Sequence, residues 1–376
     1  MSNSTQTEEK RRKISFIEAL GKGGFGSVYL ADVRSRNNFV QRIAIKILNE
    51  ELTENDDVVG RQRDEARLLA QLNHDNIVKV FDLIEVDGRP AVFMEYVPGV
   101  DMGRLIQRSP IPPKAALEVV LATASGLHAA WSTLSPITGR ALQVIHRDIK
   151  PSNLLLSEHG SLKILDFGIA RADFDREGQT QSVQFGTARY MAPEQWLNED
   201  LTPAVDIFAL GVTLLELLKG SGSGRLPLRE DKYNAAKDKH IQAVRDPVWG
   251  AVWWRKLEAL LQGMLARDPQ DRPSAEIVHE RCLELSDEIG GESLRRFARR
   301  NVPTLVLERR RKMKDASLLP SADLMFTSED PSILTVGKTT MPSFRGRMFP
   351  WATRHLAQQL LLALAFGVSL WWFLTG

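Results

Sequence analysis

The sequence has almost no cysteine, no apolar leader and no strong excess of one charge. Its single cysteine, Cys282, cannot close an intrachain disulfide or build a cysteine-rich zinc site, which fits a reducing compartment. The formal net charge of +2 argues against nucleic acid as a partner, because phosphate binding requires a concentrated basic excess. Residues 1–13 are polar and lack the apolar run of a secretory signal, so we expect a disordered N-terminal lead there.

The composition is that of an ordinary globular protein. Apolar residues make up 43% and charged residues 26% of the 376 residues, which excludes a wholly disordered, collagen-like or multispanning chain. No low-complexity break and no repeat of fixed period interrupts residues 14–285. We therefore expect one large folded domain over that range.

Strand signals precede helix signals within this domain. Residues 42–48 alternate isoleucine with other side chains, and residues 91–97 form a short apolar run before a Pro-Gly turn. Apolar residues then recur at three- to four-residue spacing over residues 117–131, and residues 205–218 are apolar nearly all round, as in a buried helix. A small strand-rich half followed by a larger helical half predicts an α+β fold.

The chain changes character after residue 285. We expect residues 286–350 to form a basic linker with scattered Pro, Ser and Thr, which can hold a short helix. Residues 291–350 carry 12 Lys and Arg against 6 Asp and Glu, whereas residues 1–290 carry 36 against 41. The folded domain is therefore slightly acidic, and the region that follows it is basic.

The strongest apolar signal lies at the end of the chain. Residues 360–374 contain no charge, and residues 356–374 would rise about 28 Å as a helix, close to the thickness of a bilayer core. Tryptophans at both ends and arginines upstream match the pattern of a membrane span. We expect residues 351–376 to be a single-pass C-terminal anchor in the plasma (inner) membrane, with the folded domain cytoplasmic. The alternative is an apolar helix packed on that domain.

The first chemical motif is a glycine-rich loop. Gly21, Gly23 and Gly26 match G-x-G-x-x-G, in which glycines let backbone N–H groups approach phosphates closely. Alone the motif is weak, since a hairpin turn followed by a solvated lysine would have the same letters. A dinucleotide fold requires an acidic residue about 20 positions later, whereas this sequence has Lys46 on a predicted strand there. A cation in that place favours a nucleoside triphosphate.

Three further motifs follow along the chain. They are His146-Arg-Asp-Ile-Lys-Pro-Ser-Asn153, Asp166-Phe-Gly168 and Ala192-Pro-Glu194. With these motifs in this order, the chain resembles the eukaryotic-type (Hanks-type) protein kinases, and more narrowly a bacterial, membrane-anchored Ser/Thr kinase. The resemblance implies a bilobal protein kinase fold, with a small β-rich N-lobe at residues 14–97 and a larger α-helical C-lobe at residues 98–285.

The resemblance also assigns the groups that transfer phosphate. It implies that Lys46 holds the α- and β-phosphates of ATP and that Glu65, on a helix, fixes Lys46 by its charge. An ordinary solvent-facing charge is the alternative for Glu65. Asp148 would act as the catalytic base or orient the substrate hydroxyl, and Lys150 would neutralise the moving phosphoryl group. A lysine at position 150 is typical of kinases that modify Ser and Thr.

A magnesium site and a nucleotide pocket are implied in the same way. Asn153 and Asp166 would supply oxygen ligands to Mg²⁺, for which Mn²⁺ could substitute, and turn formation is the alternative for both residues. Asp101 would reach the ribose hydroxyls. The residues implied for nucleotide binding are Gly21, Gly23, Gly26, Val28, Ala44, Lys46, Met94, Glu95, Val97 and Asp101. For the apolar members of this set, a plain core role is the alternative.

Two structural roles and one regulatory role complete the resemblance. Glu194 and Arg272 resemble a buried ion pair that ties the activation segment to the C-lobe, and Asp206 resembles the residue that holds the catalytic-loop backbone. Autophosphorylation in the activation segment would create an anion that pairs with Arg147. The candidate sites are Thr180 and Ser182, for which plain loop hydroxyls are the alternative.

The expected partners are proteins with Ser or Thr acceptors, the membrane, and a second kinase domain brought close by the anchor. A catalytically silent kinase-fold scaffold that acts by binding is the alternative function. The intact catalytic motifs argue against it. A small-molecule phosphotransferase of the same fold is a further alternative, which the Ala192-Pro-Glu194 segment disfavours because it serves to seat a polypeptide.

Overall fold

The computed structural model describes most of the chain in ten segments. They are residues 12–23, 26–34, 39–48, 67–86, 89–108, 110–167, 188–220, 224–316, 323–330 and 333–336. Glu65, Thr180, Ser182 and the segment 351–376 lie outside these residues, so the roles expected for them stay predictions.

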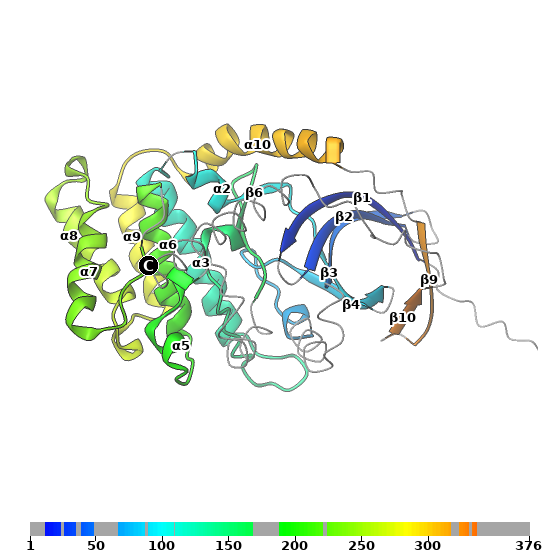
Figure 1. The fold of residues 1–376 in the computed structure, drawn as a ribbon, viewed down its shortest axis with the longest axis horizontal. Coiled ribbons are helices and arrows are strands. Elements are labelled where there is room, and N and C mark those ends of the chain that lie inside the picture. The colour runs from blue at the N-terminus through cyan, green and yellow to red at the C-terminus, as the bar shows by residue number, and fades with distance from the viewer. Residues whose placement is uncertain are drawn as a thin grey trace, which may run out of the picture. The chain divides into compact units, whose positions relative to one another are not determined.

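An antiparallel sheet of seven strands forms the N-lobe (Figure 1). The strands are β1 (Arg12–Gly23), β2 (Gly26–Arg34), β3 (Val40–Leu48), β4 (Val80–Val86), β5 (Arg89–Glu95), β9 (Asp323–Asp330) and β10 (Ile333–Val336). Their order across the sheet is β10-β9-β1-β2-β3-β5-β4. The isoleucines expected to face a core do so, since Ile43, Ile45 and Ile47 of β3 are buried with Phe93 of β5. The predicted strands 42–48 and 91–97 correspond to β3 and β5.

Helices dominate the C-lobe, together with a small sheet of three strands. The helices are α2 (Met102–Ile106), α3 (Pro113–Ser132), α5 (Pro193–Leu197), α6 (Ala204–Lys219), α7 (Glu230–Gln242), α8 (Ala251–Met264), α9 (Ala275–Glu288) and α10 (Leu294–Ala316). The strands, in spatial order, are β6 (Gly99–Asp101), β7 (Leu154–Ser157) and β8 (Leu162–Ile164). The bilobal α+β fold expected from the motifs is confirmed.

Helix α6 forms the centre of the C-lobe core. Every residue from Val205 to Leu218 is buried in it, as the apolar run in the sequence predicts. It contacts α3 and α8, and Gly211 lets α6 approach Met264 and Leu265 closely, since a Cβ at this glycine would lie 3.0 Å from a Leu265 methyl carbon. The surface of α6, apolar nearly all round, is thus covered on all sides by the lobe.

Part of the expected linker is folded onto the C-lobe. Helix α10 spans 23 residues, and its buried side chains Phe297, Ala298, Val302 and Val306 belong to the C-lobe core. Figure 1 shows α10 above α2 and β6, and α10 is in contact with α3, β6, β7 and β1. Strands β9 and β10, from the same expected linker, extend the N-lobe sheet from its β1 edge.

No helix in the described residues combines the length and the apolar content needed to cross a bilayer. The segment for which the sequence predicts a membrane anchor lies beyond those residues.

Candidate active site

The glycine-rich motif forms the turn between β1 and β2. Gly23 pairs with Gly26 at the last register position of the hairpin. A side chain at Gly26 would collide with the carbonyl group of Ile47 on β3, so this glycine is required by strand packing. A Cβ at Gly21 would meet nothing within 4 Å, so its lack of a side chain is not explained by packing. The nucleotide-binding role expected for Gly21 therefore stays a prediction.

Lys46 lies in the middle of the N-lobe sheet and reaches the C-lobe. Strand β3 pairs with both β2 and β5 at this position, opposite Val28 and Val92. The Lys46 ammonium Nζ is 2.6 Å from Oδ1 of Asp166. Because Lys46 is fixed by the sheet and Asp166 follows β8, this ion pair joins the two lobes at the place where the motifs predict phosphate and metal.

Asp148 is held by two residues of its own loop. Lys150 Nζ donates to both carboxylate oxygens of Asp148, at 3.1 and 2.9 Å. Asn153 Nδ2 donates to Oδ2 of Asp148 at 2.9 Å and to its backbone carbonyl at 2.8 Å. These bonds fix the carboxylate while keeping a cation beside it. The three residues that the sequence singles out for transfer and metal binding therefore form one cluster.

The backbone of this loop is held by Asp206 from the start of α6. Its two carboxylate oxygens accept the backbone N–H groups of His146 and Arg147, each at 2.7 Å. Arg147 has a left-handed backbone with φ of 67°, which is uncommon for a residue with a side chain and is stabilised here by these bonds. Burial raises the pKa of Asp206, against the effect of the two N–H bonds. The structural role expected for Asp206 is confirmed.

His146 is a packing residue and not a base. Its ring is fully buried, lies 4.5 Å from the Phe167 ring between centroids, and Nε2 is 2.9 Å from the Leu165 carbonyl oxygen. Burial lowers the pKa of His146, so the ring is neutral near neutral pH. These contacts tie the catalytic loop to the segment that carries Asp166.

Asn153 and Asp166 are suited to a hard divalent cation. The backbone N–H of Leu165 donates to the Asn153 carbonyl at 2.8 Å, which places Asp166 next to the catalytic loop. Desolvation opposes ionisation of Asp166, but the Lys46 charge and hydrogen bond outweigh it, so the pKa of this carboxyl is lowered. Within the described residues no cluster of three or more His, Cys, Asp or Glu could hold a metal ion. One carboxylate and one amide, completed by phosphates and water, are instead a donor set that Mg²⁺ accepts.

The hinge between the lobes carries an ion pair that the sequence did not indicate. Lys163 of β8 lies 2.6 Å from the Glu95 carboxylate at the end of β5. The same carboxylate accepts the backbone N–H of Lys79, and the Glu95 backbone N–H donates to the Lys79 carbonyl. The side chain of Glu95 is thus used to join the lobes. Because the Lys79 carbonyl also takes the Glu95 backbone N–H, this N–H is not available to an adenine ring.

The remaining nucleotide candidates occupy neighbouring elements. Met94 pairs with Ala44 across β3 and β5, and Asp101 ends β6 and caps α2 by accepting the Arg104 N–H at 3.0 Å. Val97 lies in the short segment between β5 and β6. The structure therefore brings the predicted hinge, strand and ribose residues to the junction of the lobes.

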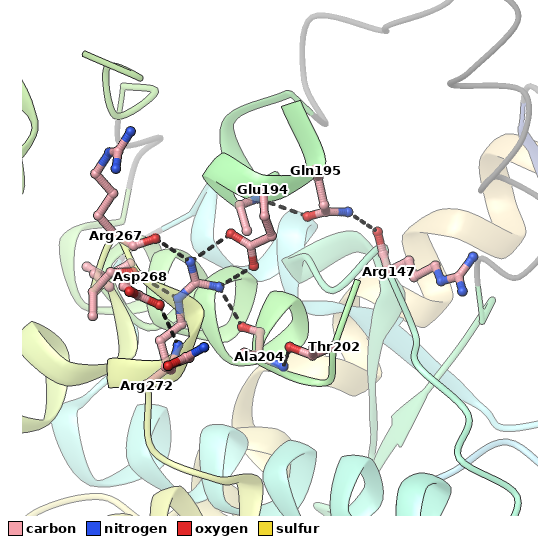
Figure 2. A network of polar contacts seen from close by, with 12 residues as sticks. Arg147, Glu194, Gln195, Thr202, Ala204, Arg267, Asp268 and Arg272 are labelled. Atoms are coloured by element: carbon pink, nitrogen blue, oxygen red, sulfur yellow. Dashed lines mark hydrogen bonds and ion pairs between the residues drawn. The ribbon is translucent and has the colours of Figure 1, made fainter. Parts of the chain in front are cut away.

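Glu194 and Arg272 form the expected buried ion pair, shown in Figure 2. Arg272 Nη1 and Nη2 lie 2.6 and 2.8 Å from the two Glu194 oxygens, and the Arg272 side chain is completely buried. Arg272 also donates to the carbonyls of Ala204, Ala266 and Arg267. Gln195, next to Glu194, donates to the Arg147 carbonyl at 3.5 Å, so this network reaches the catalytic loop (Figure 2).

Arg147 has a side-chain atom poised for a further partner. Its Nε is buried and has no hydrogen-bond partner among the described residues. An unpaired buried donor is costly, and an anionic group nearby would satisfy it. The predicted phosphorylation sites Thr180 and Ser182 lie outside those residues.

Comparison with known proteins finds protein kinases. A sequence model of the family described as "Protein kinase domain" matches residues 14–282. Tyrosine-protein kinase MasK of Myxococcus xanthus is 35% identical, over 73% of this chain and 43% of that protein. Probable serine/threonine-protein kinase PknB of Lactococcus lactis is 32% identical (61% and 34%), and serine/threonine-protein kinase PrkC of Bacillus subtilis is 32% identical (69% and 38%). The chain thus spans less than half the length of each of these relatives.

A solved structure matches as well. The crystal structure of the Mycobacterium tuberculosis PknI kinase domain superposes with a TM-score of 0.52 at 26% identity. The match covers 72% of this chain and 95% of that one.

Proposed function

The chain belongs to the protein kinase family, and on this premise we propose that it is a serine/threonine protein kinase. It would transfer the γ-phosphoryl group of ATP to Ser and Thr hydroxyls of proteins. The observation that carries this proposal is the arrangement of Asp148, Lys150 and Asn153 in one cluster, next to the Lys46–Asp166 ion pair. An intact cluster of this kind favours an enzyme over a silent scaffold, which has no use for it.

Each residue of the cluster has a separate task in the transfer. Asp148 accepts the proton of the substrate hydroxyl at one of its carboxylate oxygens, or orients that hydroxyl for attack. Lys150 lies within 3.1 Å of the same carboxylate and provides positive charge where the phosphoryl group passes. Asn153 holds Asp148 in place through two bonds from Nδ2. Catalysis by this site is therefore mainly positioning and charge neutralisation.

The nucleotide and the metal would use the groups at the lobe junction. Members of this family generally use ATP and Mg²⁺. In this chain the Asp166 carboxylate and the Asn153 amide oxygen would hold Mg²⁺, and Lys46 would bind the phosphates of ATP. When bound, the metal would neutralise charge on the phosphates. The fold already places Lys46 Nζ 2.6 Å from Asp166, so the phosphate-binding group and the metal-binding group are next to each other.

The acceptor hydroxyl belongs to Ser or Thr on the strength of Lys150. A lysine two residues after the catalytic aspartate is typical of Ser/Thr kinases and is generally missing from tyrosine kinases. Two of the relatives described above are named as Ser/Thr kinases, whereas one is named as a tyrosine kinase. Phosphoamino-acid identification on the products distinguishes these specificities directly.

Membrane attachment is part of the proposal. Residues 360–374 contain no charge and end near Trp371 and Trp372, and Trp351 precedes them. The kinase domain would then lie on the cytoplasmic side of the plasma (inner) membrane. Attachment would also raise the local concentration of kinase domains and favour phosphorylation of one copy by another. Membrane fractionation of the full chain beside a variant that ends at residue 350 tests this part separately.

The proposed activity is tested by incubating the full chain with labelled ATP, Mg²⁺ and generic protein substrates. Label is expected on Ser and Thr, and chelation of Mg²⁺ with EDTA is expected to abolish it. Activity that is insensitive to EDTA would contradict the role of Asn153 and Asp166 as metal ligands. A folded chain that binds ATP and labels no protein, itself included, would support the scaffold alternative.

A further inference from the structure

Helix α10 connects the C-lobe core to the hinge. Its N-terminal half is anchored by buried apolar side chains and by the Leu294 backbone N–H, which donates to Glu118 of α3 at 2.5 Å. A Cβ at Gly160, in the β7–β8 turn, would lie 2.6 Å from the Arg295 Cα, so this turn also packs tightly against α10. The position of α10 is therefore set by the rigid C-lobe.

The C-terminal half of α10 reaches the segment that follows the hinge. Arg309 Nη1 donates to the carbonyl oxygen of Gly99, the first residue of β6, at 3.2 Å. One residue earlier, Glu308 pairs with Arg108, just beyond the end of α2, at 2.6 Å. Arg309 thus contacts the start of β6, and Glu308 contacts the residue just beyond the end of α2. We call Glu308 and Arg309 the α10 clamp.

Asp101 lies between the two attachments of the α10 clamp. It ends β6 and caps α2, and its carboxylate bonds to the Arg104 N–H at 3.0 Å and to Arg104 Nε at 3.2 Å. On its other side β6 is paired with β7, and a side chain at Gly99 would lie 2.5 Å from the Leu156 carbonyl oxygen. The segment formed by β6 and α2 is thus paired with β7 and contacted by the α10 clamp near its start and its end. Asp101, in the middle of this segment, has little freedom to move.

Arg309 is more than a surface contact. Its Nε and Nη2 atoms are buried and have no hydrogen-bond partner among the described residues. Burial raises the pKa of Asp101, and the charges of Arg104 and then Arg309 oppose this effect. The guanidinium of Arg309 therefore sits in the electrostatic field of Asp101 as well as against the β6 backbone. Arg309 is half-buried, and its contacts are directed at β6 rather than at solvent alone.

The next residue extends the contact to the N-lobe. The Tyr96 hydroxyl in the hinge raises the pKa of Arg310, and Glu18 of β1 contributes to the same effect. Helix α10 is also in contact with β1 itself. Helix α10 thus contacts the N-lobe at β1 as well as the C-lobe.

We propose that the α10 clamp is a positioning element of the nucleotide site, which fixes the hinge-to-β6 segment so that Asp101 and the hinge backbone are preset for ATP. This inference rests on the proposed kinase function for its substrate, but its binding test requires only that the chain holds a nucleotide. Arg309 is a positioning residue and contacts neither the phosphates nor the acceptor.

The test compares the full chain with Arg309→Ala, Arg309→Lys and the control Arg300→Ala. Arg300 lies on the same helix in an ion pair with Glu292, at 2.7 Å, but away from the hinge. Affinity for ADP with Mg²⁺ is measured by calorimetry, KM for ATP and kcat by a phosphorylation assay, and thermal stability by denaturation.

Arg309→Ala is expected to weaken ADP binding and raise KM for ATP by roughly fivefold, the worth of about one hydrogen bond, with kcat within about twofold. Arg309→Lys should recover part of the affinity, because its ammonium can still donate to the Gly99 carbonyl, and Arg300→Ala should match wild type. If Arg309→Ala fails to fold, Arg309→Lys and Glu308→Gln carry the same comparison.

Unchanged ADP affinity and KM in the folded Arg309 or Glu308 variants would overturn the inference and leave α10 with a purely structural role. Equal losses in Arg300→Ala would overturn it as well. If wild type binds ADP but transfers no phosphate, the proposed function fails while the binding comparison still decides the role of the α10 clamp.

Discussion

Lys46 on strand β3 and Asp166 after strand β8 form an ion pair of 2.6 Å, although 120 residues separate them in the chain. One partner belongs to the N-lobe sheet and the other to the C-lobe segment that follows the catalytic loop. The pair therefore fixes the relation between the predicted phosphate-binding and metal-binding groups. It also keeps Asp166 ionised, because the lysine charge lowers the pKa of the carboxyl against desolvation.

Lys46→Ala is expected to lower the rate of phosphoryl transfer by about 10²-fold or more, because a preorganised charge at the phosphates is lost. The variant should remain folded, since Lys46 contributes charge and not core volume. Phosphate incorporation from labelled ATP measures the loss. Lys256→Ala is the matched control, because Lys256 also forms an ion pair, with Glu288, on the C-lobe surface. Equal rates for Lys46→Ala and wild type would contradict the role given to Lys46.

Arg272→Ala is expected to destabilise the chain by about 3 to 5 kcal/mol, because Glu194 would be left as a buried charge without its partner. The Glu194 and Arg272 side chains are 2% and 0% exposed, so solvent cannot replace the lost contact. Chemical denaturation measures the free energy of unfolding. Arg281→Ala breaks the exposed pair with Glu284 and should cost no more than about 1 kcal/mol. A loss of similar size in both variants would show that burial does not govern the Arg272 pair.

The free energy of unfolding is expected to fall as the pH drops from 7.5 towards 5.5. Burial lowers the pKa of His74, His146 and His240 below the ordinary value of about 6.5. Below that pH the unfolded chain takes up protons that the folded chain does not, so each such histidine can contribute a slope of at most about 1.4 kcal/mol per pH unit. The stability is present above the unfolded pKa and is lost on acidification.

Denaturation curves at pH 7.5, 6.5 and 5.5 check the histidine effect. The control His240→Gln removes one of the three groups at a site far from the catalytic loop and should reduce the slope. Stability that stays constant or rises over this interval would mean that the histidines are not held neutral by the fold.

Replacing both Thr180 and Ser182 with alanine is expected to slow substrate phosphorylation, because a phosphate in the activation segment would pair with Arg147 and order the segment. The buried Nε of Arg147, which has no hydrogen-bond partner within the part of the chain that the structure describes, motivates this expectation. Mass spectrometry of active wild-type protein should find phosphate on at least one of the two residues. Full activity with both sites unmodified would refute it.

Short sequence motifs predicted most of the catalytic cluster, because Asp148, Lys150 and Asn153 are held by bonds within five residues of one another. The isoleucines of β3 and the apolar run of α6 were equally readable, since both are local patterns of residues that the fold buries, although Ala44 between the isoleucines is buried as well.

Contacts between distant segments could not be predicted in this way. The Lys163–Glu95 pair joins two lobes, and Arg309 meets Gly99 across 210 residues, so neither leaves a local pattern. Helix α10 was expected to be part of a linker because the sequence there is rich in arginine and its apolar residues form only a narrow stripe. This stripe is recognised as a core surface only once the helix is seen packed on the C-lobe. Strands β9 and β10 depend likewise on the exposed edge of β1.

The most direct test of the central claim is phosphate transfer by the full chain and by Asp148→Asn, with the modified residues identified by mass spectrometry. Asparagine has the size and shape of aspartate, and its amide oxygen can still accept from Asn153 and Lys150 at the Oδ2 position, whereas its NH2 group cannot accept the second Lys150 bond and cannot act as a base. Wild type is expected to place phosphate on Ser and Thr, and Asp148→Asn to be slower by about 10²- to 10⁴-fold while it still binds ATP. Undiminished transfer by Asp148→Asn, or phosphate found only on Tyr, would contradict the account.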